Sequence, residues 1–312
     1  MHTTTRSDAT GSRRPRWRSV ALWSAVALVA LVVVVLAARW LRTLPAIDDF
    51  IVTYPGTSEL PEGAPIGIPL WLAWQHFLNA FFLVLLVKTG LVLRAKQRPK
   101  VFWRRDNTRG IRTAGAPRRI GIDLWLHLWV DALWMLNGVV YVVLLFATGA
   151  WMRIVPTSWD IVPNAISAGL QYASLDWPVH DGWATYNGLQ LLSYFATVFI
   201  AAPLAFVTGL RLSSVWPQDA PRLNSVFPER LARALHYPVM LYFLAFTAVH
   251  TVLVLATGML RNLDHMYLAR DTETWLGFAV FAASLVAMVA AWVLARPALL
   301  KRIAARSGQT WG

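Results

Sequence analysis

The sequence contains no cysteine and little charge. None of its 312 residues is a cysteine, which excludes disulfides, thiolate metal sites, iron–sulfur clusters and covalently attached c-type haem. Charged residues make up only 14% of the chain and hydrophobic residues 57%, whereas a soluble domain carries about 25% charged residues. This deficit of charge indicates that lipid surrounds much of the chain.

Acidic residues are also scarce relative to basic ones. The chain has 29 Lys and Arg against 16 Asp and Glu, which gives a net charge of +13. The basic residues gather in short segments between apolar runs, and this placement sets the orientation of a membrane protein. We therefore expect membrane lipid as a partner and no nucleic acid.

Six apolar runs are long enough to cross a bilayer, which takes roughly 20 apolar residues. The runs cover residues 20–38, 66–93, 124–149, 188–210, 234–260 and 274–295. The first exceeds the apolar region of a signal peptide, so we expect a retained helix over 20–41. The sequence predicts an all-α integral membrane bundle of six transmembrane helices: a four-helix core, an extra N-terminal helix and a C-terminal helix.

Charge alternates between the connections of these helices. Residues 94–119 hold ten Lys or Arg, residues 211–233 hold four Arg, and the segment after 295 holds four more basic residues, whereas the other connections hold most of the acidic residues. The positive-inside rule then places both termini in the cytoplasm, with basic tails at 1–19 and 296–312. We expect a multi-pass protein of the cell (inner) membrane. The long outer connection 150–187, rich in aromatic residues, is expected to lie on the membrane or under a partner protein.

Four of the seven histidines fall inside the spans: His76, His127, His236 and His250. His236 and His250 lie 14 residues apart on one helix, which puts them about 40° from the same face and about 21 Å apart along the axis. The predicted topology places His127 at the depth of His236, and His76 at the depth of His250. Two imidazole pairs at two depths predict two haem b groups, each with two axial ligands.

The three other histidines, outside the spans, are expected to be solvated and receive no role.

This arrangement resembles the cytochrome b subunits of formate dehydrogenase (its gamma subunit) and of thiosulfate reductase. The likeness runs over residues 66–295 and is carried by the four histidines and by two segments, 186–213 (YNGLQLLSYFATVFIAAPLAFVTGLRLS) and 235–258 (LHYPVMLYFLAFTAVHTVLVLATG). It implies the membrane subunit of a larger oxidoreductase, often one with a molybdopterin catalytic subunit, that exchanges electrons with menaquinone or ubiquinone. It also implies that Asn187, in the Tyr-Asn-x-x-Gln motif, lies at the quinone site. A helix N-cap explains this asparagine equally well.

The extra N-terminal helix departs from that family and inverts the core, placing the His76–His250 haem outside. Which membrane face docks the partner enzyme therefore stays open. Nothing in the sequence suggests a substrate-converting site beyond quinone chemistry, so we expect an electron-transfer subunit. Two alternatives remain: a transporter or channel whose histidines and Asp131 form a proton relay without haem, and a stand-alone quinone-coupled haem reductase that serves a periplasmic enzyme.

A Thr-Gly dipeptide recurs near the end of four spans, at Thr89-Gly90, Thr148-Gly149, Thr208-Gly209 and Thr257-Gly258. One explanation is a helix C-terminal signal. The other is that glycine allows a flat cofactor or a neighbouring helix to approach the backbone. Four arginines lie near the span ends and either set the topology or pair with haem propionates; these are Arg94, Arg153, Arg211 and Arg261.

Overall fold

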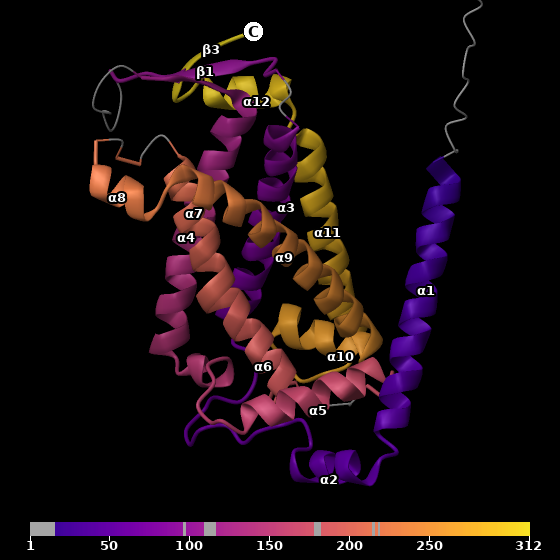
Figure 1. Ribbon diagram of the computed structural model, residues 1–312. Coiled ribbons are helices and arrows are strands. Elements are labelled where there is room, and N and C mark those ends of the chain that lie inside the picture. The colour runs from indigo at the N-terminus through magenta and orange to yellow at the C-terminus, as the bar shows by residue number, and fades with distance from the viewer. Residues whose placement is uncertain (1–15, 96–97, 109–116, 178–181, 214–215, 218) are drawn as a thin grey trace, which may run out of the picture.

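Residues 16–95, 98–108, 117–177, 182–213, 216–217 and 219–312 are described by a computed structural model, shown as a ribbon in Figure 1. Six of its helical segments are long and apolar enough to cross a membrane. They are α1 (Arg16–Leu41), α3 (Leu70–Arg94), α4 (Ile122–Ala147), the segment from α6 to α7 (Gly188–Leu212), α9 (Glu229–Ala256) and α11 (Trp275–Leu294). The predicted all-α bundle is confirmed, and the chain is a multi-pass membrane protein.

The fourth span is not a uniform α-helix. It consists of α6 (Gly188–Phe195), a π-helical stretch (Ala196–Ala201) and α7 (Ala202–Leu212). Pro203 stands at the start of α7, and because proline has no N–H to donate, the regular hydrogen-bond ladder is interrupted there. A π-helical insertion rotates the side chains that follow it, and such insertions are frequent at functional sites.

The core is formed by helices that pack in pairs. Helix α3 packs against α4, α7 packs against α9, and α11 covers α3. At the centre, Ala201, Val239 and Phe243 are buried together. Large apolar side chains on the outer faces remain exposed, among them Val143 and Val252. A bundle with this surface needs lipid as its solvent, because water would be in contact with a continuous apolar belt.

One end of the bundle, here called the sheet end, carries a three-stranded antiparallel sheet. Strand β1 (Phe102–Arg105) lies between β2 (Arg119–Gly121) and β3 (Gly308–Trp311). Helix α12 (Pro297–Ala304) packs beneath the sheet, and the short α8 (Pro221–Val226) lies at the same end (Figure 1). The buried contacts are made by Val101, Ile122, Trp125, Leu300 and Ala304. The C-terminal segment, predicted only as a tail, is thus folded against the basic connection.

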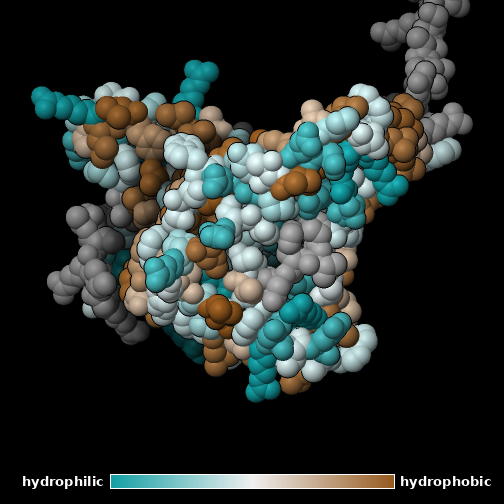
Figure 2. Space-filling view, turned by 90° about the horizontal axis from the view of Figure 1, so that it is seen from below, coloured by the Kyte–Doolittle hydropathy of each residue, from teal (hydrophilic) through white to brown (hydrophobic). Residues whose placement is uncertain are grey.

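The opposite end, here called the α5 end, is covered by short helices. These are α2 (Pro45–Thr53), a 3-10 turn (Ala150–Arg153), α5 (Ile161–Ala173), α10 (Met259–Leu263) and a π-helical turn (Asp264–Leu268). The connection 150–187 contributes α5, which crosses the end of the bundle and packs against α6 (Figure 1). Figure 2 looks onto this face, where hydrophilic and hydrophobic residues are mixed.

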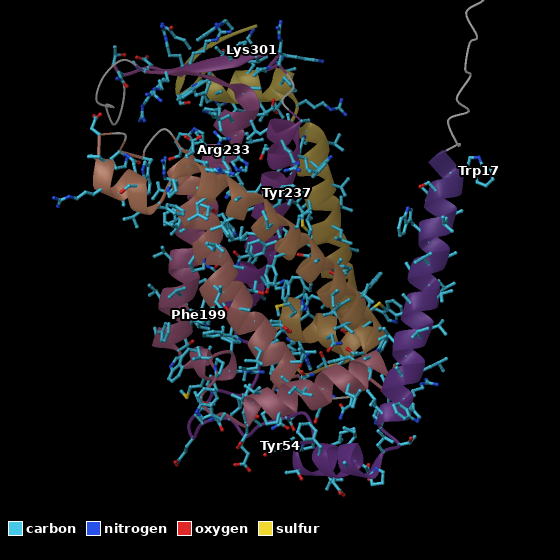
Figure 3. All side chains as sticks on the ribbon, viewed as in Figure 1. Trp17, Tyr54, Phe199, Arg233, Tyr237 and Lys301 are labelled. Atoms are coloured by element: carbon cyan, nitrogen blue, oxygen red, sulfur yellow. The ribbon has the colours of Figure 1, made fainter. Side chains whose placement is uncertain are left out.

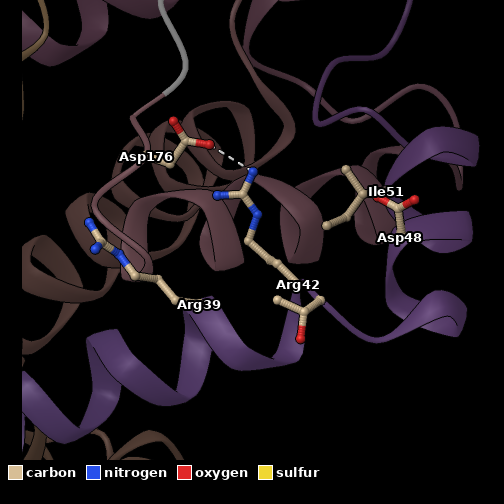
Figure 4. Close-up of a pocket in the computed structure, with 6 residues that line it drawn as sticks. Arg39, Arg42, Asp48, Ile51 and Asp176 are labelled. Atoms are coloured by element: carbon tan, nitrogen blue, oxygen red, sulfur yellow. Dashed lines mark ion pairs between the residues drawn. The ribbon is translucent and has the colours of Figure 1, made fainter.

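Helix α1 stands beside the bundle, and in the described part of the chain its contact with α5 lies near its C-terminal end (Figure 1). None of its apolar window is buried against the rest of the chain. Arg39 donates to the carbonyl of Ser174 (3.0 Å), while Arg42 donates to the Ser174 hydroxyl (2.7 Å) and pairs with Asp176 (2.7 Å; Figure 4). Helix α1 is therefore an appendage to the other five spans.

Candidate functional site

The four histidines of the spans lie in two facing pairs. His76 on α3 faces His250 on α9, with ring centroids 6.2 Å apart and planes at 57°. His127 on α4 faces His236 on α9, with centroids 6.5 Å apart and planes at 74°. Tyr237, which follows His236, marks the half of α9 nearer the sheet end in Figure 3. These are the same pairs that the predicted topology matches in depth.

The separations of the rings fit two imidazoles that bind one metal from opposite sides. A metal–imidazole nitrogen bond is about 2.0–2.1 Å long, and the ring centre lies about 1.1 Å behind the nitrogen, so two opposed rings have centroids about 6.3 Å apart. Both observed separations lie within a few tenths of an ångström of this value.

Each pair supplies only two protein ligands. In the part of the chain that the structure describes, no group of three or more His, Cys, Asp or Glu side chains could hold a metal ion. Protein sites for a bare metal ion usually supply at least three ligands. A haem iron, in contrast, brings its equatorial nitrogens with it and needs only axial side chains. Paired imidazoles without further ligands therefore suit a haem better than a bare ion.

Two threonine hydroxyls contact a ring nitrogen of each histidine in the pair at the sheet end. The Thr89 hydroxyl lies 2.8 Å from Nδ1 of His127, and the Thr208 hydroxyl lies 2.9 Å from Nδ1 of His236. Both hydroxyls also donate to backbone carbonyls of their own helix, those of Leu85 and Leu204 respectively. In the tautomer that carries its hydrogen on Nδ1, each histidine donates to its threonine, and the hydroxyl hydrogen goes to a carbonyl. This tautomer leaves the lone pair of Nε2 free, as a metal ligand requires.

Aromatic packing positions the pair at the α5 end. The ring of His250 is stacked on Phe246, with centroids 5.6 Å apart and planes at 4°, and meets Tyr194 edge-on at 6.1 Å. His76 meets Tyr267 edge-on at 6.1 Å, and its buried Nδ1 has no hydrogen-bond partner among the described residues. These ring contacts fix the orientation of both imidazoles within the bundle.

The four Thr-Gly dipeptides divide between the two explanations offered for them. Gly149 (φ +75°) and Gly258 (φ +116°) follow helix ends and adopt the left-handed backbone of a C-terminal cap. Gly90 and Gly209 instead lie inside α3 and α7, and a Cβ at Gly209 would stand 3.3 Å from Cε1 of His236. The two internal dipeptides therefore give space and a hydrogen bond to a histidine. The sequence shows the repeated motif, but not that Thr89 and Thr208 contact histidines of other helices.

Asn187 is fully buried and caps helix α6. Its side chain accepts from the backbone N–H of Gln190 (2.9 Å), and the Gln190 side chain accepts in return from the N–H of Asn187 (3.1 Å). The Asn187 amide also donates to the hydroxyl of Tyr172 on α5 (2.9 Å). The N-cap, one of the two roles considered for this residue, is thus present. The quinone contact stays a prediction.

Loss of this cap should destabilise the fold. We expect Asn187→Ala to cost about 1 kcal/mol of unfolding free energy, because the N–H of Gln190 loses its acceptor and the contact between α6 and α5 is weakened. Thermal unfolding in detergent measures this loss, and Asn187→Ser, which preserves an N-cap oxygen, should recover most of it. If Asn187→Ala were as stable as the wild type and slowed only a reaction with quinone, Asn187 would act as a quinone contact and not as a stabilising N-cap.

His265 differs from the expectation of a solvated residue. It is 3% exposed, donates through Nε2 to Asp271 (2.8 Å) and packs on Trp183. Burial of the adjacent Asp264 acts to raise its pKa, but hydrogen bonds from Thr272, Thr274 and the N–H of Gly277 outweigh this effect and hold the pKa below its ordinary value. Asp264 therefore stays ionised and ties the connection before α11 to the start of that helix. This cluster is structural.

Comparisons with protein-family models, with curated proteins and with solved structures find no match for this chain.

Proposed function

We propose that this protein is a di-haem cytochrome b subunit that passes electrons between the quinone pool and a partner oxidoreductase. The observation that carries the proposal is the presence of two facing imidazole pairs, at 6.2 and 6.5 Å between ring centroids, at two depths of one membrane bundle. In the sheet-end pair, threonine hydroxyls lie at Nδ1 of both rings, and the tautomer that donates to them leaves Nε2 for a metal.

Each residue of the site then has a defined task. His76 and His250 hold one haem b, and His127 and His236 hold the second. Bound haem supplies a one-electron carrier at each position. Thr89 and Thr208 keep the proton on Nδ1 of their histidines, so that Nε2 stays available. The apolar bundle excludes water from both positions.

Helix α9 connects the two positions because it carries one histidine of each pair. His236 and His250 are separated by about 21 Å along the helix axis. Aromatic rings line the interval: Tyr242 is stacked on Phe246 (centroids 6.1 Å apart), and Phe246 is stacked on His250. The two haem positions are thus linked through one helix and its packed side chains.

The quinone and the partner enzyme are proposed because the chain resembles the cytochrome b subunits named above. Menaquinone or ubiquinone is the exchangeable substrate, and both dissolve in the lipid that covers the exposed apolar faces of the bundle. The partner is an oxidoreductase of the molybdopterin type. The chain itself carries electrons and does not convert the partner's substrate.

Haem stoichiometry tests the proposal. Purified protein should contain two haem b per chain, extractable by acid acetone because the chain has no cysteine for covalent attachment. The measurements are a pyridine haemochrome assay and a dithionite-reduced-minus-oxidised spectrum. Protein that is folded and active in membranes but free of haem would favour the proton-relay alternative.

For orientation, we propose that the sheet end faces the cytoplasm, since the connections there hold most of the basic residues. Cysteine at the exposed Thr108, in the basic connection, should resist an impermeant thiol reagent in intact cells, whereas cysteine at the exposed Thr157, at the α5 end, should react. Permeabilised cells provide the control, in which both variants should react. The reverse pattern in intact cells would place the His76–His250 pair on the cytoplasmic side.

A further inference from the structure

Two cationic side chains are buried in the described part of the chain, and neither has a carboxylate partner there. Arg153 is 4% exposed and Arg211 is 7% exposed. No described Asp or Glu lies within salt-bridge distance of either guanidinium, although the exposed Arg233 and the half-buried Arg42 both have such partners. A buried charge without a counter-charge costs several kcal/mol, so this arrangement requires an explanation.

The groups that surround both guanidinium ions are polar but neutral. Arg153 donates to the carbonyls of Gly67 and Gly182 and lies 4.7 Å above the ring of Tyr186, while its Nε is buried without a partner. Arg211 donates from Nε to the carbonyl of Phe227 (2.7 Å) and lies 5.2 Å from the ring of Trp216. Carbonyls and ring faces orient a cation, but they do not neutralise it.

Each buried arginine is connected to one histidine pair. Arg211 follows Thr208 by three residues on α7, so both lie on one helix face, and Thr208 holds His236. At the α5 end, Arg153 packs on Tyr186, Tyr186 meets Tyr194 with centroids 5.1 Å apart, and Tyr194 meets His250. Both arginines lie beyond their pair toward the nearer end of the bundle, because Arg153 follows α4 and Arg211 ends α7.

We infer that Arg153 and Arg211 each bind a carboxylate, and that this carboxylate is a propionate of the adjacent haem. The inference rests on the proposed function. Haem b carries two ionised propionates, and a guanidinium binds a carboxylate through two parallel hydrogen bonds. The pairing neutralises both buried arginines and turns the propionate edge of each haem toward the nearer membrane surface. An anionic lipid headgroup has the same charge, but the burial of both arginines favours a ligand that is itself enclosed.

Replacement of each arginine by methionine tests this assignment, since methionine keeps the length of the side chain and removes the charge. Arg153→Met should release the haem held by His76 and His250 about 10–100-fold faster than the wild type, and Arg211→Met should do the same for the other haem, because a charged hydrogen-bonded partner is lost. Haem transfer to apomyoglobin measures the rate. Arg153→Lys and Arg211→Lys keep the charge but lack the two parallel N–H groups of the guanidinium. Their haem-release rates should therefore lie between those of the wild type and those of the methionine variants. The exposed Arg296→Met is the matched control and should behave as the wild type.

A second measurement needs no haem. In protein purified from haem-deficient cells, Arg153→Met and Arg211→Met should raise the melting temperature, since they remove an unpaired buried charge. If the wild type holds two haems and both variants release haem at the wild-type rate, the propionate assignment is wrong but the proposed function stands. If the wild type holds no haem, both the assignment and the proposed function are wrong. Haem release that differs from the wild type only after addition of phosphatidylglycerol would identify a lipid headgroup as the ligand and overturn the propionate assignment.

Discussion

Under the proposed assignment, His76→Ala and His250→Ala will each lose the same haem, and His127→Ala and His236→Ala will each lose the other. An axial imidazole removed from a six-coordinate haem leaves one protein ligand, and the haem then dissociates or becomes high-spin. The facing rings, 6.2 and 6.5 Å between centroids, determine which variants share a phenotype. The expected effect is a loss of about half the haem per chain, with the remaining spectrum unchanged. Optical and electron paramagnetic resonance spectra of the four variants measure it.

His265→Ala is the control for these variants, because His265 is buried outside the spans and is bound to Asp271. Both haems should remain in that protein. If His76→Ala and His236→Ala instead gave the same spectrum, each haem would be held by histidines that the structure does not bring together, and the depths of α3 and α4 along α9 would be wrong.

Thr89→Val and Thr208→Val should weaken haem binding at the sheet end without removing a ligand. Valine has the shape of threonine but cannot accept the hydrogen bond from Nδ1–H, so the imidazole loses its fixed tautomer and orientation. Loss of such a partner typically lowers metal affinity or activity about 10–100-fold. Haem retention on dilution and the midpoint potential of this haem are the measurements, and Thr89→Ser and Thr208→Ser should restore both.

The chain offers a matched control for the threonine variants. Thr148 belongs to another Thr-Gly dipeptide, and among the described residues its hydroxyl has one hydrogen-bond partner, the carbonyl of Leu144. Thr148→Val should therefore leave both haems at their wild-type affinity. An equal loss from Thr148→Val and Thr89→Val would mean that the hydroxyls support the helices and not the histidines.

The sequence predicts the spans well because a membrane helix must satisfy its own backbone and present apolar side chains over a fixed length. The pairing of the histidines follows from the same topology, since alternating helix directions fix the depth of each residue. Helix ends are less well predicted: α9 runs from Glu229 to Ala256, whereas the apolar run suggests residues 234–260. The polar first turn of α9 and the left-handed Gly258 account for this shift.

Contacts between distant segments could not be predicted. Strand β3 pairs with β1 across more than 200 residues, and each strand has only four residues. Such short strands carry no alternating pattern that distinguishes them from a loop. The same limit applies to Thr89 and His127, because a hydrogen bond between two helices depends on their relative rotation. The sequence therefore identifies the metal-binding candidates but not the groups that orient them.

The attachment of α1 at a single end gives this helix a mechanical independence that the other spans lack. Its apolar run, residues 20–38, extends about 28 Å at 1.5 Å per residue, close to the hydrocarbon thickness of about 30 Å. In the described part of the chain, α1 contacts α5 near Arg39 and Arg42, and its apolar window is not buried against the other spans. The tilt of α1 can therefore follow the surrounding lipid, whose thickness changes the orientation of a helix that is not packed along its length.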